Sequence, residues 1–383
     1  MLDRFKRFFS ALQSSDASVV GVDVGSAYIK VVQLRRKKGK AVLETYGSLA
    51  LGPYAGVEIG RATRLPAERL AEALRDLMRE AHVTTKQAAF AIPFSSSLVT
   101  PIEMRVLDPK ELATAVPIEA RKYVPVPISE VNLDWWIIPD EPPRVTSEVL
   151  QNGGGSATQT ETASGAGTMP QTMHILIAAI HNEATNRFQS LARASGLESS
   201  FFEIELFSTV RALFPQDLEP HAVLDLGAGE TKLYIVDRGL PRLSHIISHG
   251  AQDITLALSR SLGITVEEAE RLKREQGLGS GRQEESASLN ALLNVVFSEA
   301  NRVLGSFERR FGRRVRSMAL SGGGANLKGV QAVAEQSSPV AVERANPFAQ
   351  VEAPAFLDEV LKVAGPEFTV AIGVAFRKLQ EAA

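Results

Sequence analysis

Apolar and polar residues form a clear pattern in the stretch VVGVDVGSAYIKVVQL, which runs from Val19 to Leu34. The first apolar run predicts a buried strand, the segment around Asp23 and Gly25 predicts a bend, and the alternation after it predicts a second strand. A glycine at the bend lets the backbone approach a ligand closely. The pattern therefore predicts a strand, turn and strand unit whose turn lies against a bound molecule.

This unit occurs twice in the chain. The stretch HAVLDLGAGETKLYIV matches the first one without a gap and repeats its aspartate, glycine and lysine at Asp225, Gly227 and Lys232. Two copies imply two similar halves. Each copy continues through a glycine-containing turn into another alternating stretch, as antiparallel hairpins do, and helices are predicted at 66–81 and 265–274. Duplicated sheets with helices packed on them predict an α/β or mixed α+β fold.

A block of about residues 93–181 separates the two halves. It contains the stretch VTPIEMRVL, a predicted helix over 109–122, and a proline-bounded turn followed by a strand that carries Trp135 and Trp136. The stretch 142–172 has almost no apolar residue, so we expect a flexible loop there that carries no chemistry.

Composition excludes several classes of protein. The 383 residues are 44% hydrophobic, carry a formal net charge of −2 and include no cysteine. The absence of cysteine excludes disulfide scaffolds, cysteine nucleophiles and thiolate metal sites. The net charge and the short basic run 35–38 do not favour nucleic acid, and no apolar run is long enough to cross a bilayer.

The N-terminal residues 1–17 have a composition of their own. Apolar residues at helical spacing alternate there with arginine and lysine. Such a segment fits a short interfacial or partner-binding helix, and it fits a frayed terminus equally well. A single segment of this kind binds lipid weakly.

The two acidic turns suit a polyphosphate held between them. Their backbone N–H groups can form a cradle for anions, and Asp23 and Asp225 can hold water around a magnesium ion. Lys30 lies seven residues after Asp23, an odd spacing that puts it on the same face only if the turn shifts the register. We still expect Lys30 to contact phosphate. Three glycines at 322–324, after an apolar strand and before a helix start, are expected to form a third wall.

These stretches occur in the order and approximate spacing of the nucleotide-site motifs of the actin, sugar kinase and heat-shock chaperone superfamily. GVDVGSAYIK, LDLGAGETK, EEAERLK and LSGGGANLKG carry the resemblance. Within the superfamily, the chain resembles the PilM family of type IV pilus assembly proteins, relatives of the division protein FtsA, and YVPVPISEVNLDW is its most PilM-like stretch. The resemblance implies an actin-like (ribonuclease H-like) fold of duplicated domains around a nucleotide cleft, with an FtsA-type inserted subdomain.

The resemblance also implies subdomain boundaries. After the amphipathic tail at 1–17, subdomain 1A would cover 18–93, completed by 182–215 and 363–383. The inserted subdomain 1C would cover 94–181 with its flexible loop at 142–172. The second half would consist of subdomain 2A and subdomain 2B, at 216–252 with 315–362 and at 253–314 respectively.

Carried over residue by residue, the resemblance implies an ATP site. The two phosphate motifs match Asp23, Gly25, Ser26, Ala27, Lys30, Asp225, Gly227, Ala228 and Gly229. The adenosine side matches Glu270, Lys273, Gly322, Gly323 and Gly324. On spacing alone, Glu270 and Lys273 are better explained as a surface ion pair one helical turn apart.

The hydrolytic residue is less well matched. Glu205 falls where chaperone-like members have the glutamate that positions the attacking water, but Leu206 replaces the proline that usually follows it. The second turn continues with Glu230-Thr231-Lys232 in place of a threonine pair and an aspartate. We therefore expect ATP binding with at most slow ATPase activity, and the residues leave open whether ATP is hydrolysed at all.

The function that the resemblance implies is an ATP-binding scaffold of the type IV pilus inner-membrane assembly platform. Its implied partners are the cytoplasmic N-terminal segment of PilN and the cytoplasmic motor ATPases, with ATP and Mg as ligands and with a homo-oligomer or ring left open. It would lie at the cytoplasmic face of the bacterial inner membrane. Two alternatives are an FtsA-like division filament, for which we find no C-terminal amphipathic helix, and a small-molecule kinase, for which we find no added general base.

Overall fold

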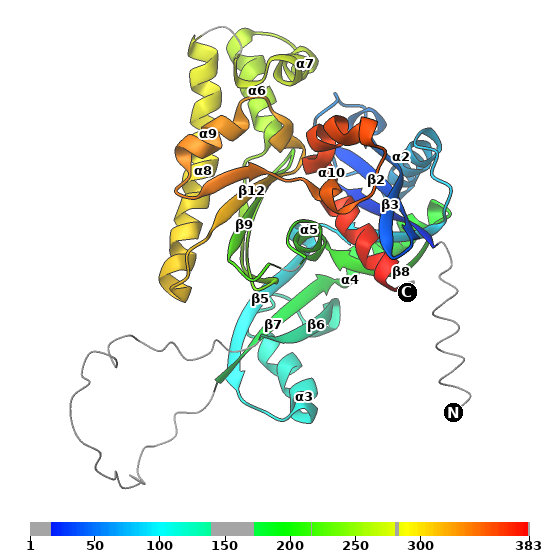
Figure 1. Ribbon diagram of the computed structural model, residues 1–383, viewed down its shortest axis with the longest axis vertical. Coiled ribbons are helices and arrows are strands. Elements are labelled where there is room, and N and C mark those ends of the chain that lie inside the picture. Colours follow the sequence, from blue (N-terminus) through cyan, green and yellow to red (C-terminus); the bar gives the residue numbers. More distant parts are fainter. Residues whose placement is uncertain (1–16, 139–171, 216, 280–282, 382–383) are drawn as a thin grey trace, which may run out of the picture. The chain divides into compact units, whose positions relative to one another are not determined.

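The computed structural model describes residues 17–138, 172–215, 217–279 and 283–381, and the chain divides into two compact units (Figure 1). The larger unit combines the chain up to Ser97 with the chain from Ile180 onward, and the smaller one covers Leu98–Ala179. The tail at 1–17 and the loop at 142–172 lie, apart from their last residues, outside the described ranges. In the described ranges, no helix has both the length and the apolar character that crossing a bilayer requires.

The larger unit contains two sheets with the same strand order. The first has the order β3-β2-β1-β4-β8 and the second β11-β10-β9-β12-β13. In both sheets, three consecutive antiparallel strands are followed by two strands that pair in parallel with the first of them and with each other. This shared order confirms the predicted duplication. The first sheet consists of β1 Ser18–Val24, β2 Tyr28–Lys37, β3 Lys40–Ala50, β4 Gln87–Ile92 and β8 Glu198–Ile204. The second consists of β9 His221–Leu226, β10 Thr231–Asp237, β11 Leu240–Ile247, β12 Ser317–Ser321 and β13 Ala341–Arg344.

Helices pack on these sheets or on one another through their buried faces. In the first half these are α2 Ala67–Glu80, α4 Asn182–Ala194, α5 Glu205–Leu213 and α10 Asp358–Glu381. On α2 the expected residues Leu70, Ala73, Leu74 and Leu77 are buried. In the second half the helices are α6 Ala251–Leu262, α7 Val266–Gln276, α8 Gln283–Phe311 and α9 Val330–Ser337.

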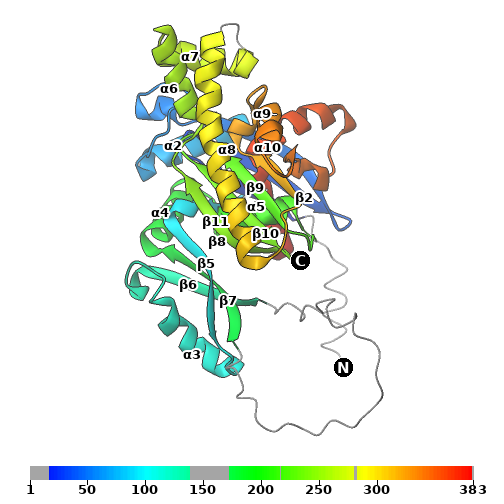
Figure 2. The ribbon, with the colours of Figure 1, turned by 90° about the vertical axis from the view of Figure 1, so that its left-hand side faces the viewer.

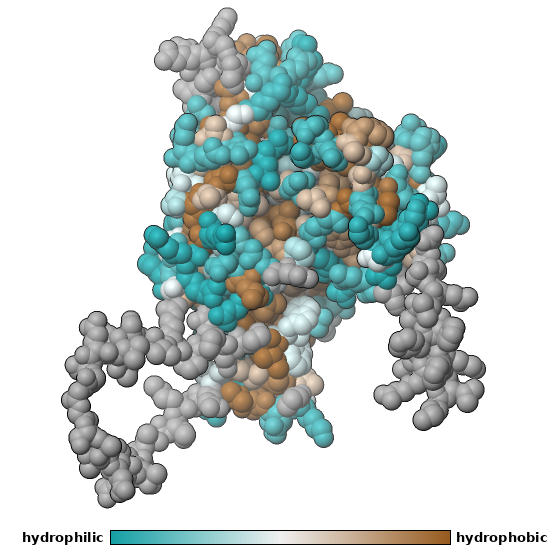
Figure 3. All heavy atoms as spheres, viewed as in Figure 1, coloured by the Kyte–Doolittle hydropathy of each residue, from teal (hydrophilic) through white to brown (hydrophobic). Residues whose placement is uncertain are grey.

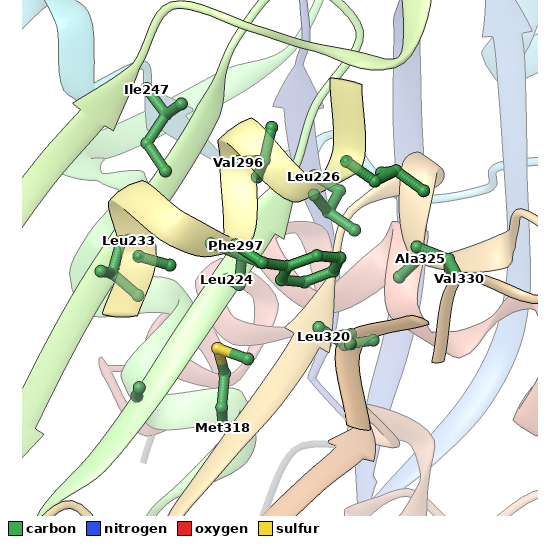
Figure 4. Close-up of a cluster of buried hydrophobic side chains, with 14 of the residues drawn as sticks. Leu224, Leu226, Leu233, Ile247, Val296, Phe297, Met318, Leu320, Ala325 and Val330 are labelled. Atoms are coloured by element: carbon green, nitrogen blue, oxygen red, sulfur yellow. The ribbon is translucent and has the colours of Figure 1, made fainter. Parts of the chain in front are cut away.

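The second half has a well-packed apolar core between its sheet and α8 (Figure 4). Phe297, which is 1% exposed, points among Leu224 and Leu226 of β9 and Leu320 of β12. Figure 2 shows α8 running along this sheet. Hydrophilic side chains gather over the lower end of α8 in Figure 3, where the helix ends in exposed arginines. The helix is therefore amphipathic, with its apolar side toward the sheet.

The smaller unit has its own core. Its strands are ordered β5-β7-β6, and its elements are β5 Ser97–Arg105, α3 Pro109–Ala120, β6 Val131–Ile138 and β7 Thr172–His181. Ile102, Leu112, Val116 and Ile175 are among its buried residues. The carboxylate of Glu111 accepts from the backbone N–H of Asp108 at 3.3 Å, which satisfies one free donor at the start of α3.

Helix α10 lies in backbone contact with both β1 and α5. A Cβ atom added at Gly21 of β1 would lie 2.0 Å from the Ala371 carbonyl oxygen, and one added at Gly373 would lie 1.9 Å from the Ser208 carbonyl oxygen. Both distances are far shorter than a non-bonded contact between carbon and oxygen, so both positions require glycine, which has no side chain. Two glycines thus allow α10 to fit between the sheet and α5.

We expect Gly373→Ala to lower the free energy of unfolding by at least about 2 kcal/mol, because the methyl group would push α10 away from α5. Gly305→Ala on α8 is the matched control. Its Cβ would meet only the end of the Arg309 side chain at 3.3 Å, and the gain in helix propensity should stabilise the protein by up to about 1 kcal/mol. Urea unfolding of the two variants should therefore shift in opposite directions, and equal shifts would contradict this account of the contact.

Candidate functional site

A cavity of about 1010 Å³ lies within the larger unit and is lined by both halves. The ends of β1 and β9 reach it, since Asp23 and Asp225 are among its lining residues. Every residue that the sequence predicted for the site lines this cavity, from the first phosphate turn to the three glycines at 322–324. The fold thus brings together segments that are about 300 residues apart in sequence.

At the first turn, an aspartate and a lysine form a buried ion pair. Asp23 on β1 is the direct cross-strand partner of Lys30 on β2, and Lys30 Nζ lies 2.9 Å from Asp23 Oδ2. The expectation that this needed a register shift was wrong, because directly opposed residues of an antiparallel pair share a face whatever their separation in sequence. Burial opposes the charge of Lys30, but Asp23 outweighs it and raises the pKa of the ammonium. Lys30 therefore stays charged.

The second turn repeats this arrangement with a difference. Lys232 on β10 is the cross-strand partner of Asp225, yet its Nζ lies 3.7 Å from Asp225 Oδ2 and only 2.7 Å from Glu205 Oε1. Burial opposes its charge, but Glu205 and Asp225 raise the pKa of the ammonium above its usual range. The site predicted from the sequence does not include Lys232, although its gapless match to Lys30 is a signal for it.

Glu205 is the first residue of α5 and comes directly after β8. Its side chain is 7% exposed, and its Oε1 accepts a hydrogen bond from the backbone N–H of Phe94 at 2.6 Å. The same oxygen faces Lys232. The carboxylate is therefore at the cavity, as predicted, and two donors fix one of its oxygens.

The glycine loop after β12 packs against the second turn. A Cβ added at Gly322, where φ is +80°, would lie 2.3 Å from Asp225 Oδ1, so only glycine lets the loop come this close. The segment Gly323–Asn326 is a 3-10 turn, and the next α-helix begins only at Val330. At Gly323 an added Cβ would meet nothing within 4 Å. Gly323 therefore lines the cavity at a position where a side chain would have open space.

Glu270 and Lys273 do pair one helical turn apart, but the expected surface location was wrong. Their side chains are 7% and 10% exposed, and Lys273 Nζ lies 2.6 Å from Glu270 Oε2. Thr255 of α6 donates to the same carboxylate oxygen at 2.7 Å. Hydrogen bonds and the ion pair with Lys273 lower the pKa of Glu270 despite its burial. Spacing could not reveal this burial, because it comes from the packing of α6 on α7.

Contacts between the two halves close one side of the cavity. Arg274 of α7 donates a hydrogen bond to the Tyr28 hydroxyl of β2, with its guanidinium 5.3 Å from the ring centre. The Ala62 N–H donates to Gln252 Oε1 at 3.1 Å. Glu367 of α10 also lines the cavity, and burial raises the pKa of its carboxyl. Sequence reasoning missed Tyr28, Arg274 and Glu367, which carry no motif signal of their own.

The site offers buried positive charge and acidic groups from two similar halves. The expected cradle of N–H groups is smaller than predicted, because the Gly25 N–H donates to the Tyr28 carbonyl at 2.9 Å and the Gly227 N–H to the Asp225 carbonyl at 3.1 Å. Two sheets of the same order, each ending in an acid and glycine turn at one cavity, define an actin-like protein of duplicated domains. The family model for the type IV pilus assembly protein PilM matches residues 21–152 and 160–379. The chain therefore belongs to this family.

Solved structures show the same fold. The PilM-PilN type IV pilus biogenesis complex is 24% identical, with 95% of this chain and 99% of that chain covered and a TM-score of 0.74. The ethanolamine utilization protein EutJ from Carboxydothermus hydrogenoformans is 15% identical, with 94% of this chain and 89% of that chain covered and a TM-score of 0.52. These likenesses concern the fold.

We expect Glu270→Gln to lower the free energy of unfolding at pH 7 by about 3 kcal/mol or more, because it leaves Lys273 buried without its charge partner. The folded pKa of Glu270 lies below its unfolded value, so its contribution is complete above pH about 4.3 and is lost as the pH falls through the folded pKa. The difference between wild type and variant should therefore shrink in acid, as measured by urea unfolding from pH 7 to 3. Glu267→Gln, on the exposed side of the same helix, should show no such difference at any pH. A penalty that stays constant in acid would contradict the assignment.

Proposed function

We propose that this chain is an ATP-binding scaffold of the type IV pilus assembly platform. One observation carries the proposal: two matched glycine turns from two matched halves each bring an aspartate and a buried lysine to one cavity. Family membership supplies the process, and the geometry of the cavity supports the ligand.

The phosphates of ATP would lie between the two turns. The N–H groups of Ser26, Ala27, Ala228 and Gly229 would face them, because those of Gly25 and Gly227 already donate within their own turns. Lys30 and Lys232 would supply positive charge. Glu270, Lys273 and the loop at 322–324 would then form the adenosine side. Ligand pockets usually enclose about 300–1,000 Å³, so the cavity has room for a nucleotide.

A magnesium ion would fit this site through water. Among the described residues, no three acidic or histidine side chains converge as metal ligands. Magnesium commonly keeps several waters and binds phosphate oxygens, so Asp23 and Asp225 would hold it through its hydration shell. Bound in this way, the ion would neutralise phosphate charge.

We infer that nucleotide acts as a conformational ligand, because the cavity walls come from both halves. ATP bound between them would favour their closed arrangement and so influence surfaces elsewhere on the protein. We expect turnover slower than about one per minute, which is far below ordinary enzymes.

The proposed partner is the cytoplasmic N-terminal segment of a PilN protein. The solved relative described as a PilM-PilN complex supports this choice. The scaffold would act at the cytoplasmic face of the bacterial inner membrane and link that segment to the motor ATPases, as a monomer, a homo-oligomer or a ring.

Gly323→Phe tests the nucleotide site without disturbing the fold, because the new side chain enters open space. We expect ATP to stabilise the wild type by about 2.7 kcal/mol at a concentration one hundred times its Kd, and to leave Gly323→Phe unchanged. Thermal unfolding with and without ATP measures both. Gly323→Ala, whose single methyl group meets nothing within 4 Å, should still bind ATP and is the control for the loss of glycine itself. No stabilisation of the wild type would refute the proposal, and normal stabilisation of Gly323→Phe would place the ligand elsewhere.

The partner is tested by pull-down from bacterial membranes with the full chain as bait, read by mass spectrometry. We expect PilN to be recovered with the wild type in an ATP-dependent manner and to be depleted with Gly323→Phe. Recovery of division proteins in place of pilus proteins would contradict the scaffold function. Equal recovery of PilN by both baits would show that nucleotide does not control the partner.

A further inference from the structure

Lys232 holds an unusual position among the charges of the cavity. Its Nζ lies 2.7 Å from Glu205 Oε1, 3.7 Å from Asp225 Oδ2 and 4.0 Å from Glu230 Oε1, and its side chain is 12% exposed. Glu205 comes from the first half, whereas Lys232 comes from the second. The close ion pair therefore links the two halves at the cavity.

The matching lysine of the first turn behaves differently. Lys30 lies 2.9 Å from its own cross-strand aspartate, and no carboxylate of the other half is paired with it among the described residues. Lys232 has the same register to its own aspartate but is closer to the glutamate by a full ångström. The two lysines therefore differ in their closest partner, and the partner of Lys232 is Glu205, the carboxylate that could orient a water.

Hydrolysis of ATP would need that carboxylate. The oxygen of a water forms a bond to the terminal phosphorus, the bond from that phosphorus to the bridging oxygen breaks, and ADP and phosphate leave. The proton of the water passes to a base, which must have a free oxygen within hydrogen-bond reach. The Phe94 N–H and the Lys232 ammonium already occupy Glu205 Oε1. Burial raises the pKa of the Glu205 carboxyl overall, and the Lys232 charge opposes that rise, so the carboxylate would be a stronger base without the lysine.

We propose that Lys232 is a positioning residue that holds Glu205 away from the attacking water and lends its charge to the bound phosphates, so that ATP is retained. This proposal deepens the proposed function and rests on it. A purely structural ion pair between the halves is the competing explanation. It predicts lower stability on substitution but no change in the fate of bound ATP.

Lys232→Met in the full chain separates the two explanations. We expect single-turnover hydrolysis of bound ATP to become at least about tenfold faster. A well-placed general base typically contributes about 100-fold or more, so a partly aligned one should still give this gain. The affinity for ATP, measured by calorimetry, should fall about tenfold or more because one charged partner of the phosphates is lost. Lys30→Met is the matched control and should lose affinity without gaining turnover.

The double variant Glu205→Gln/Lys232→Met assigns the gain to the glutamate. We expect its turnover to return to the wild-type rate, since the freed base has been removed.

An unchanged rate in Lys232→Met with ATP bound would overturn the proposal, and so would an acceleration that survives Glu205→Gln. If Lys232→Met loses the circular dichroism spectrum of the fold, Lys232→Gln, which removes the charge but keeps a donor, takes its place with the same criteria. Failure of the wild type to bind ATP would refute the proposed function itself, which is a distinct result.

Discussion

The buried charges at the cavity constrain the rest of the structure. Lys30, Lys232, Asp23, Asp225 and Glu205 have lost most of their hydration, so each needs an opposite charge within a few ångströms. Direct cross-strand pairing in both hairpins meets this need, and it fixes their register. It also fixes the start of α5, because Glu205 is the first residue of that helix and faces the other half. Electrostatics therefore couples the two halves where ligand would bind.

Glycines allow close backbone packing around these charges. Gly21 and Gly373 let α10 lie in backbone contact with β1 and α5, and Gly322 lets the glycine loop pack on the carboxylate of Asp225. Gly60 does the same opposite Glu270, where an added Cβ would lie 2.6 Å from the carboxyl carbon. Charged groups can remain buried near the cavity because the backbone around them approaches closely enough to exclude most water.

Much of the fold and of the site could be predicted from the sequence. The hairpins, the duplication and the two acidic turns follow from two matched stretches, because strand alternation and glycine turns are local properties. The adenosine-side residues Glu270 and Lys273 were implied only by the family resemblance. The burial of Glu270 could not be predicted in this way. An ion pair at i, i+3 has the same spacing on an exposed helix as on one covered by α6, and only packing distinguishes the two. Tyr28 and Arg274 were missed for a related reason, since they meet only across the two halves.

The sequence by itself determined the type of site: acids and glycines at two turns, a lysine seven residues after each acid, and membership in the PilM family. The tertiary structure alone decided which charges pair. Lys30 and Lys232 occupy equivalent places in the two hairpins, yet Lys30 lies closest to its own aspartate and Lys232 lies closest to Glu205, 27 residues before it in the chain. The physical reason is that a buried ammonium is placed by the nearest carboxylates in space, and the chain reaches that arrangement only when α5 packs beside the second sheet.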